Sequence, residues 1–193
     1  VCMSIETPTP TLGLDSLDTL MLDSPKFDQD TGLLNASTFE QVLANSFEHA
    51  SGSGEPLTLV RISFDRAEND IPRRPLELRK LVSGVTAILR KHFIDSGGVI
   101  GRLDTESFAV LVPSHSRVVV TRTADAFRNE FEQACLEWEV PGRTHVGIAY
   151  LDHTTQGIYQ RVEQLSTAAA RAMKASASNG GNCIKVFTPK KAA

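Results

Sequence analysis

The spacing of apolar residues changes several times along the chain, and each change predicts a different element. Residues 57–64 alternate between apolar and polar side chains, as a strand with one buried face does. After Pro75 the apolar residues return at every third or fourth position, which predicts a helix. Ser37 to Glu40 has the capping-box spelling of a helix start. The same patterns predict further helices at about residues 37–50, 117–138 and 158–176, and strands at 99–103, 107–112, 145–151 and 183–187.

The order of these elements predicts the fold class. A strand, a helix, a hairpin, a helix and a strand follow one another in the centre of the chain, which is the split βαβ, ferredoxin-like arrangement. We therefore predict an α+β domain at residues 27–188, with a mostly antiparallel, five-stranded central sheet flanked by helices. Residues 189–193 are expected to form a tail. This fold serves many functions and by itself names none.

Residues 1–26 differ in composition from the domain that follows. They are rich in Pro, Ser and Thr and carry no Lys or Arg before the last position. Leu14, Leu17 and Met21 have helical spacing. The segment is therefore interpreted either as a linker or as a connector helix that carries a signal from an upstream domain. Because the chain begins at Val1 rather than Met, we expect it to be part of a longer protein.

Composition and charge exclude some classes of function. The chain has 193 residues, a net charge of −3 and 41% apolar residues, as an ordinary globular domain does. Without a surplus of Lys and Arg, we expect no binding to nucleic acid. No apolar run is long enough to cross a bilayer, so no membrane segment is expected in this fragment. Cys2, Cys135 and Cys183 lie far apart without metal-ligand spacing, which favours reduced thiols and a cytoplasmic protein.

Four short motifs follow one another along the chain. They are Asp28-Gln-Asp-Thr-Gly-Leu-Leu-Asn35, Ser63-Phe-Asp65, Arg102-Leu-Asp-Thr-Glu-Ser-Phe-Ala109, and the strand from Thr144 with the Ala-rich helix to Lys174 and Gly180-Gly-Asn182. In this order they resemble the landmarks D-x-L-T-G-L-x-N, D-x-D, R-x-G-G-D-E-F-A and G-R-N of the GGDEF family of diguanylate cyclases. The resemblance covers residues 27–188. It implies a nucleotidyl-cyclase fold and a role in bacterial cyclic di-GMP signalling.

The chemistry of that family sets what the site would need. Its members join two GTP molecules, and each of two domains presents one GTP. The 3′-hydroxyl of one GTP attacks the α-phosphate of the other, a reaction that depends on divalent metal and on positioning. Mg²⁺ takes carboxylate oxygens beside the phosphates. The two signature glycines leave room for the phosphates to approach the backbone.

The resemblance places the main change in the signature itself. The matching residues are Asp104, Thr105, Glu106, Ser107 and Phe108, so a carboxylate and a branched hydroxyl side chain replace the two glycines. At about 4 Å and an effective dielectric constant near 20, the charge of Asp104 would oppose a triphosphate by several kcal/mol. No catalytic residue is therefore expected, and the chain is predicted not to be an enzyme.

Some residues of the resemblance are kept. Asp65 and Glu106 are candidate metal ligands, and Asn69, Asp70 and Lys174 are candidate nucleotide contacts. Each also has a plainer interpretation, as a solvated acid or loop residue or, for Lys174, as a cation favoured at a helix C-terminus. No cofactor is expected, with Mg²⁺ only if GTP binding is retained.

Other matched positions are changed or are expected to be structural. Ser63 replaces the first Asp of D-x-D, and Gly181 replaces the Arg of G-R-N. Asp28 and Asn35 are expected to fix the turn into the first helix. Arg102 is expected to pair with a neighbouring acid.

The predicted function is that of a catalytically inactive GGDEF-like regulatory or interaction domain in a cyclic di-GMP signalling protein. Two alternatives stay open. One is a domain that binds GTP without turnover, as an allosteric input; the other is a weakly active diguanylate cyclase that uses Asp65 and Glu106. The expected partner is a neighbouring domain of the longer chain, either a phosphodiesterase or a sensor domain, and a homodimer is left open.

Overall fold

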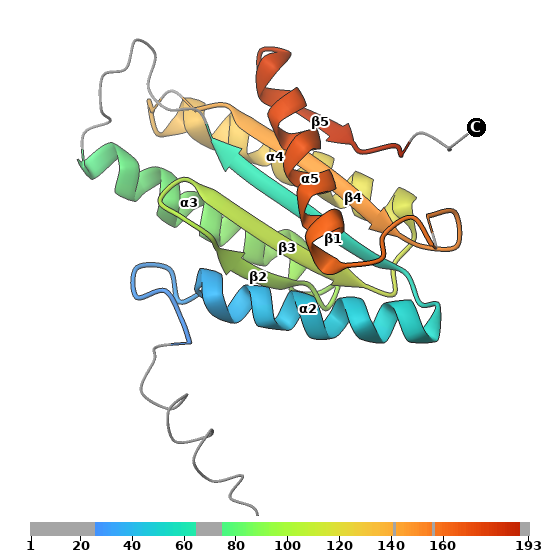
Figure 1. Cartoon of the computed structure of the whole chain (residues 1–193). Coiled ribbons are helices and arrows are strands. Elements are labelled where there is room, and N and C mark those ends of the chain that lie inside the picture. Colours follow the sequence, from blue (N-terminus) through green and yellow to red (C-terminus); the bar gives the residue numbers. More distant parts are fainter. Residues whose placement is uncertain (1–25, 65–74, 141, 156, 190–193) are drawn as a thin grey trace, which may run out of the picture.

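The computed structural model describes residues 26–64, 75–140, 142–155 and 157–189 (Figure 1). The elements in chain order are α2 (Ala36–Ser53), β1 (Leu57–Phe64), α3 (Pro75–Phe93), β2 (Val99–Arg102), β3 (Ser107–Pro113), α4 (Arg117–Glu137), β4 (Thr144–Leu151), α5 (Val162–Ser178) and β5 (Cys183–Val186).

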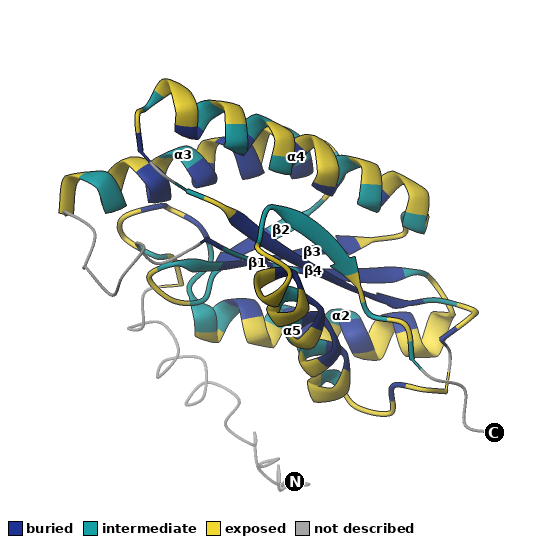
Figure 2. Ribbon diagram, turned by 90° about the horizontal axis from the view of Figure 1, so that it is seen from above, coloured by how far each residue is buried: buried dark blue, intermediate teal, exposed yellow. Residues whose placement is uncertain are grey.

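One five-stranded sheet in the order β2-β3-β1-β4-β5 forms the centre of the described chain. Neighbouring strands are antiparallel except for β4 and β5, which are parallel. Helices α3 and α4 cover one face, and α2 and α5 cover the other (Figure 2). The predicted α+β fold with a mostly antiparallel sheet is confirmed.

Alternation along the strands divides the core between the two faces. Val60, Ile62 and Phe64 of β1 pack with α3 and α4, whereas Leu57 and Leu59 pack with α2 and α5. Both clusters contain fully buried phenylalanines and leucines. Both faces of the sheet are therefore covered, whereas the alternation in residues 57–64 indicated one buried face.

The predicted boundaries differ from the structure at the starts of α2 and α5 and at the end of α2, which runs to Ser53 instead of residue 50. Helix α2 is capped by Asn35, whose side chain accepts a 2.9 Å hydrogen bond from the Thr38 N–H, so the predicted capping box at Ser37 is not its start. Helix α5 begins at Val162 instead of residue 158, because the side chain of Gln164 accepts the N–H groups of the two preceding loop residues. Tyr159, which falls inside the predicted range of that helix, instead packs into the core from the loop.

The N-terminal linker or connector predicted at 1–26 lies outside the described residues except for its last position, as does most of the predicted tail. Within the described ranges, no helix has the length and apolar character needed to span a bilayer.

A charged pair joins the start of α4 to the end of β4. Arg117 contacts the Asp152 carboxylate through Nε at 2.5 Å and Nη2 at 2.8 Å, and its guanidinium lies 4.8 Å from the centre of the Tyr150 ring. The hydrogen bonds from Arg117 hold the pKa of Asp152 far below its ordinary value, although partial burial opposes this shift. The pair therefore links folding to pH.

We expect Asp152 to contribute about 2 kcal/mol to the free energy of unfolding at neutral pH, the usual worth of a hydrogen-bonded charged pair. Because the folded-state pKa is lowered, this contribution is full above the unfolded pKa near 3.8 and is lost as the pH falls toward the folded value. Urea unfolding of the native protein and of Asp152→Asn at several pH values measures it. The difference between the two should be constant from pH 6 to 8 and shrink below about pH 4; a difference that does not change with pH contradicts it.

Candidate functional site

The signature residues form the turn between β2 and β3. The Leu103 N–H donates to the Ser107 carbonyl at 2.8 Å and closes the hairpin. Inside the turn, Asp104 Oδ1 accepts the Glu106 N–H at 2.9 Å. Asp104 and Thr105 are exposed, whereas Phe108 is fully buried. The carboxylate at the position of the first signature glycine therefore has a structural partner, the backbone of its own turn.

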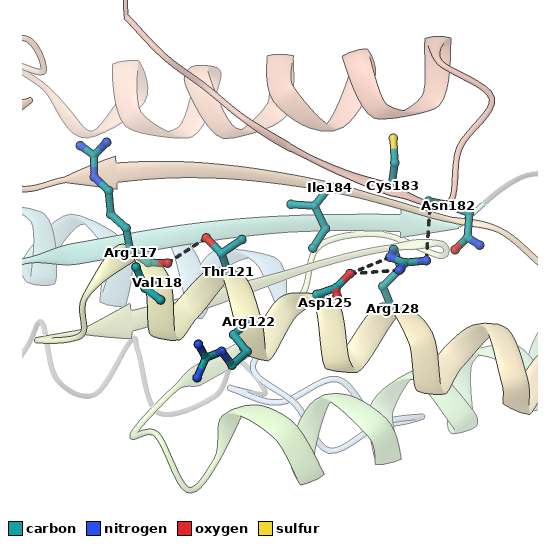
Figure 3. Close-up of a pocket in the computed structure, with 9 residues that line it drawn as sticks. All are labelled: Arg117, Val118, Thr121, Arg122, Asp125, Arg128, Asn182, Cys183 and Ile184. Carbon is teal, nitrogen blue, oxygen red and sulfur yellow. Dashed lines mark hydrogen bonds and ion pairs between the residues drawn. The ribbon is translucent and has the colours of Figure 1, made fainter.

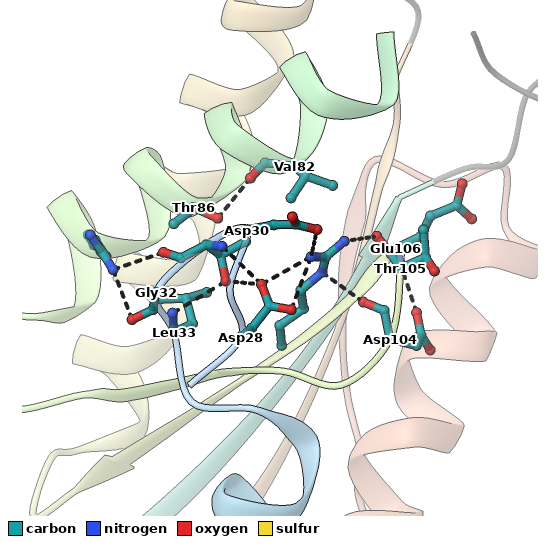
Figure 4. Close-up of polar contacts among 12 residues, drawn as sticks. Asp28, Asp30, Gly32, Leu33, Val82, Thr86, Asp104, Thr105 and Glu106 are labelled. Carbon is teal, nitrogen blue, oxygen red and sulfur yellow. Dashed lines mark hydrogen bonds and ion pairs between the residues drawn. The ribbon is translucent and has the colours of Figure 1, made fainter. Parts of the chain in front are cut away.

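Arg102, the last residue of β2, links this turn to the loop before α2 through hydrogen bonds and ion pairs. Its Nη1 lies 3.0 Å from Asp28 Oδ1 and 3.0 Å from Asp30 Oδ2, and its Nε and Nη2 donate to the carbonyls of Asp104 and Thr105. Figure 4 shows the two aspartates facing the turn. These ion pairs confirm the expectation that Arg102 pairs with an acid. The Arg102 side chain is only 10% exposed, so the pairs form in a nearly buried position.

Asp28 also organises its own loop, as expected. Its Oδ1 accepts the N–H of Thr31 at 2.9 Å and the hydroxyl of Thr31 at 2.6 Å. Partial burial alone would raise the pKa of Asp28, but the hydrogen bonds from Thr31 and Arg102 outweigh it and hold that pKa below its ordinary value. Arg90 of α3 donates to the carbonyls of Thr31 and Gly32, so the loop is held from a second side.

A row of polar residues crosses the sheet beside the turn. Ser63 of β1 lies opposite Ser107 of β3 and His145 of β4, and His145 lies opposite Cys183 of β5. Alternation puts Ser63 on the same sheet face as Leu59, the face that α2 and α5 cover. This polar row therefore lies at the end of β1, next to the signature turn and on the sheet face that α2 and α5 cover.

Arg61 lies one step further along that face and was not singled out by sequence reasoning. It lies opposite Ala109 of β3 and Gly147 of β4. Burial lowers the pKa of Arg61, and the negative charges of Asp104 and Glu40 partly restore it. Its Nε has no hydrogen-bond partner among the described residues. The positive charge of Arg61 therefore interacts with the negative charge of Asp104, the residue at the position of the first signature glycine.

Helix α5 crosses the sheet directly above Gly147. A Cβ on this glycine would lie 2.1 Å from the Met173 N and 2.3 Å from the Ala169 carbonyl oxygen. Lys174 follows on the exposed side of the helix, and no hydrogen bond of its ammonium group is found within the described ranges. Its candidate role as a nucleotide contact therefore stays a prediction.

The surroundings of Gly181 disfavour the arginine that the G-R-N motif has at this position. Its φ is +74°, a conformation that favours glycine, and a Cβ would lie 2.6 Å from His145 Cε1. An arginine at this position would require the buried His145 to move.

The other predicted site residues stay untested. Asp65, Asn69 and Asp70 lie outside the described residues. Glu106 is half-buried in the turn, and no group of three or more His, Cys, Asp or Glu side chains in the described part could hold a metal. The candidate metal and nucleotide contacts thus remain predictions. Arg61 could have been noticed from the sequence as the one charged residue of the strand at 57–64, next to the altered motif.

No protein-family model and no curated protein matches the chain. Solved structures do match it. The coiled coil and GGDEF domain of DgcB from Caulobacter crescentus in complex with c-di-GMP aligns with a TM-score of 0.71 and 17% identity, over 89% of this chain and 90% of that one. The active GGEEF domain of a diguanylate cyclase from Vibrio cholerae aligns with 0.67 and 15% identity, over 82% of this chain and 99% of that one.

A further match is a diguanylate cyclase in complex with an activator. SiaD from Pseudomonas aeruginosa, with its activator SiaC, aligns with a TM-score of 0.66 and 14% identity. The match covers 89% of this chain and 65% of SiaD, so the chain spans less than two thirds of that protein.

These matches correct one prediction and confirm another. The expectation that the chain is not an enzyme is contradicted, because structures with its fold include an active diguanylate cyclase domain. The altered turn is therefore no ground for excluding catalysis. The resemblance to GGDEF domains in four motifs is borne out by the arrangement of helices and strands. At these identities the likeness establishes the fold, and the chain has the nucleotidyl-cyclase fold of GGDEF domains.

Proposed function

We propose that this chain is a GGDEF-like regulatory domain of a bacterial cyclic di-GMP signalling protein, and that its input is GTP bound beside the β2–β3 turn. The proposal is supported by the shared fold with DgcB, which was solved with c-di-GMP. The observation that carries the nucleotide input is Arg61, a cation in the field of Asp104. The output is contact with a neighbouring phosphodiesterase or sensor domain, as SiaD contacts its activator SiaC.

The charge balance of the site favours a nucleotide more than Asp104 alone would suggest. A carboxylate about 4 Å from a phosphate costs about 4 kcal/mol at an effective dielectric constant of 20, and a cation at a similar distance offsets a similar amount. We propose Arg61 as that cation, because its charge interacts with that of Asp104, whose Oδ1 accepts the Glu106 N–H. Arg61 thus takes over the neutralising role that Gly181 cannot fill.

Metal is proposed only together with the nucleotide. Asp65 and Glu106 are the carboxylates that the motif places beside the phosphates, and Mg²⁺ would be held between these oxygens and the phosphate oxygens. Ser63 contributes a neutral oxygen in place of the first aspartate. With fewer anionic ligands we expect Mg²⁺ to bind weakly without GTP and to assist GTP binding modestly.

Regulation of this kind is compatible with turnover of GTP. A domain that binds GTP as an input can also turn it over slowly. Formation of cyclic di-GMP is therefore measured alongside binding, and Glu106→Ala is the variant that should lower any turnover that is found.

A thermal-shift experiment tests the proposed input. GTP with Mg²⁺ at about 100 times its dissociation constant should stabilise the domain by about 2.7 kcal/mol. For a domain of this size that corresponds to a rise in Tm of roughly 5 to 10 °C. ATP at the same concentration is the matched control and should give a much smaller rise.

Two outcomes would count against the proposal. One is a Tm unchanged by GTP up to millimolar concentration, and the other is an equal rise with ATP, which would mean that only the phosphate charge is sensed. Liquid chromatography of the same samples reports whether GTP has been consumed and whether cyclic di-GMP has formed.

A further inference from the structure

A stripe of residues on the outer side of α4 has the spacing of a helix–helix seam. Alternating steps of four and three residues connect Val118, Arg122, Asp125, Asn129, Glu132 and Leu136. Such steps average 3.5 residues, the repeat that keeps one face of a helix toward another helix. We call these six residues the α4 stripe.

The stripe points away from the core. The buried residues of α4 are Val120, Ala124, Phe127, Phe131 and Cys135, which lie on the opposite side of the helix. At the two ends of the stripe, Val118 is 65% exposed and Leu136 is 70% exposed. Figure 2 shows this outward side of α4 as exposed over much of its length. The four stripe residues between these two apolar ends are polar or charged.

When two copies of the α4 stripe lie antiparallel, positively charged residues of one face negatively charged residues of the other. We propose that a second copy of this chain packs its α4 antiparallel against this stripe, with the two-fold axis near residue 127. Val118 then meets the partner's Leu136, Arg122 meets the partner's Glu132, and Asp125 meets the partner's Asn129. Each pair occurs twice because a two-fold interface is self-complementary.

Contacts within the chain already orient the acids of the stripe. Arg128 Nη2 lies 3.0 Å from Asp125 Oδ1, and its Nη1 lies 3.5 Å from Glu132 Oε2. The acid side chains remain 52% and 45% exposed, so each can accept a further partner. Fixing a side chain before association reduces the entropy lost on binding.

A parallel arrangement of the same two helices is disfavoured. It would place each charged residue of the stripe beside its own copy, arginine against arginine and glutamate against glutamate. The antiparallel arrangement replaces these repulsions with two Arg–Glu pairs, and this difference selects the direction.

An open groove of about 710 Å³ borders the stripe and widens the contact surface (Figure 3). It lies between α4 and the edge strand β5 and shares Val118, Arg122 and Asp125 with the stripe. A seam of this length is roughly 27 Å long at 1.5 Å per residue. A single helix pair buries less than the roughly 1,200 Å² of a stable interface, so the dimer is expected to be weak unless side chains also enter this groove.

Sedimentation equilibrium of the full chain over a wide concentration range tests the proposal. The native protein should form a dimer with a dissociation constant of about 10 μM, as a small interface does. Arg122→Glu and Glu132→Arg should each weaken dimerisation about tenfold, because each replaces two opposite-charge pairs by like-charge pairs. The double variant Arg122→Glu/Glu132→Arg restores both pairs with reversed sign and should recover most of the affinity.

Matched controls separate association from folding. Leu136→Asp should abolish the dimer, whereas Leu76→Asp, at an equally exposed leucine of α3, should leave it unchanged. Circular dichroism melts of every variant verify that the monomer is folded. A native protein that stays monomeric up to about 1 mM overturns the proposal, since that limit corresponds to only about 4 kcal/mol of association. A dimer that the single variants do not weaken, or that the double variant does not recover, overturns it as well.

Discussion

Replacing Arg102 with methionine is expected to lower the free energy of unfolding by about 3 to 4 kcal/mol, since removing one partner of a buried charged pair usually costs this much. Its side chain is 10% exposed and donates to Asp28, Asp30 and two carbonyls of the signature turn. Methionine fills similar space but leaves the Asp28 carboxylate half-buried without its cation. Urea unfolding measures the change.

Two controls define what is lost. Arg102→Lys keeps the charge but cannot reach both aspartates and both carbonyls with one planar group, so it should recover less than half of the loss. Arg171→Met removes an exposed arginine of α5 and should change stability by less than about 0.5 kcal/mol. If Arg102→Met costs no more than Arg171→Met, the contacts between the loop and the turn do not stabilise the domain.

Among Gly→Ala substitutions in the sheet, Gly147→Ala is expected to destabilise the protein most. We expect it to lower the free energy of unfolding by about 3 kcal/mol, which is in the upper part of the usual cost of overpacking. The added Cβ would lie 2.1 Å from the Met173 N and 2.3 Å from the Ala169 carbonyl oxygen. Both are backbone atoms of α5, so no side-chain rotation relieves the clash and the helix must move away from β4. Thermal and urea unfolding should both report the loss.

A Gly→Ala substitution at another position should raise the free energy of unfolding instead of lowering it. Gly52 lies in α2, and a Cβ there would meet no atom within 4 Å. Gly52→Ala should therefore stabilise by about 0.5 to 1 kcal/mol, the difference in helix propensity. A Gly147→Ala protein within about 1 kcal/mol of the native stability would mean that α5 does not sit tightly on the sheet.

The strands and the fold class could be predicted because their signals are local. Alternation in residues 57–64 predicted the strand, but it indicated one buried face, whereas the structure covers both faces of β1. Helix starts were less predictable, because capping depends on which side chain turns back to the backbone. Asn35 and Gln164 decide the starts of α2 and α5, whereas the spelling at Ser37 looked equally suitable.

Long-range pairing was the part of the site that the sequence left open. Arg102 was expected to find an acid, but its partners Asp28 and Asp30 lie more than 70 residues away and are brought to it by the fold. The charge of Asp104 was weighed alone, without the opposite charge of Arg61 that interacts with it. The inference that catalysis was lost rested on that isolated charge, and the likeness to an active domain contradicts it.

Arg61 is the proposed cation that offsets the charge of Asp104 when a triphosphate binds. Calorimetric titration of GTP with Mg²⁺ into the native protein and into Arg61→Met, with Arg61→Lys as the charge-preserving control, tests this directly. We predict binding to the native protein, similar binding to Arg61→Lys, and at least tenfold weaker binding to Arg61→Met, equivalent to about 1.4 kcal/mol. Equal affinity of the native and Arg61→Met proteins, both folded by circular dichroism, would contradict it, and so would the absence of heat from the native protein at millimolar GTP.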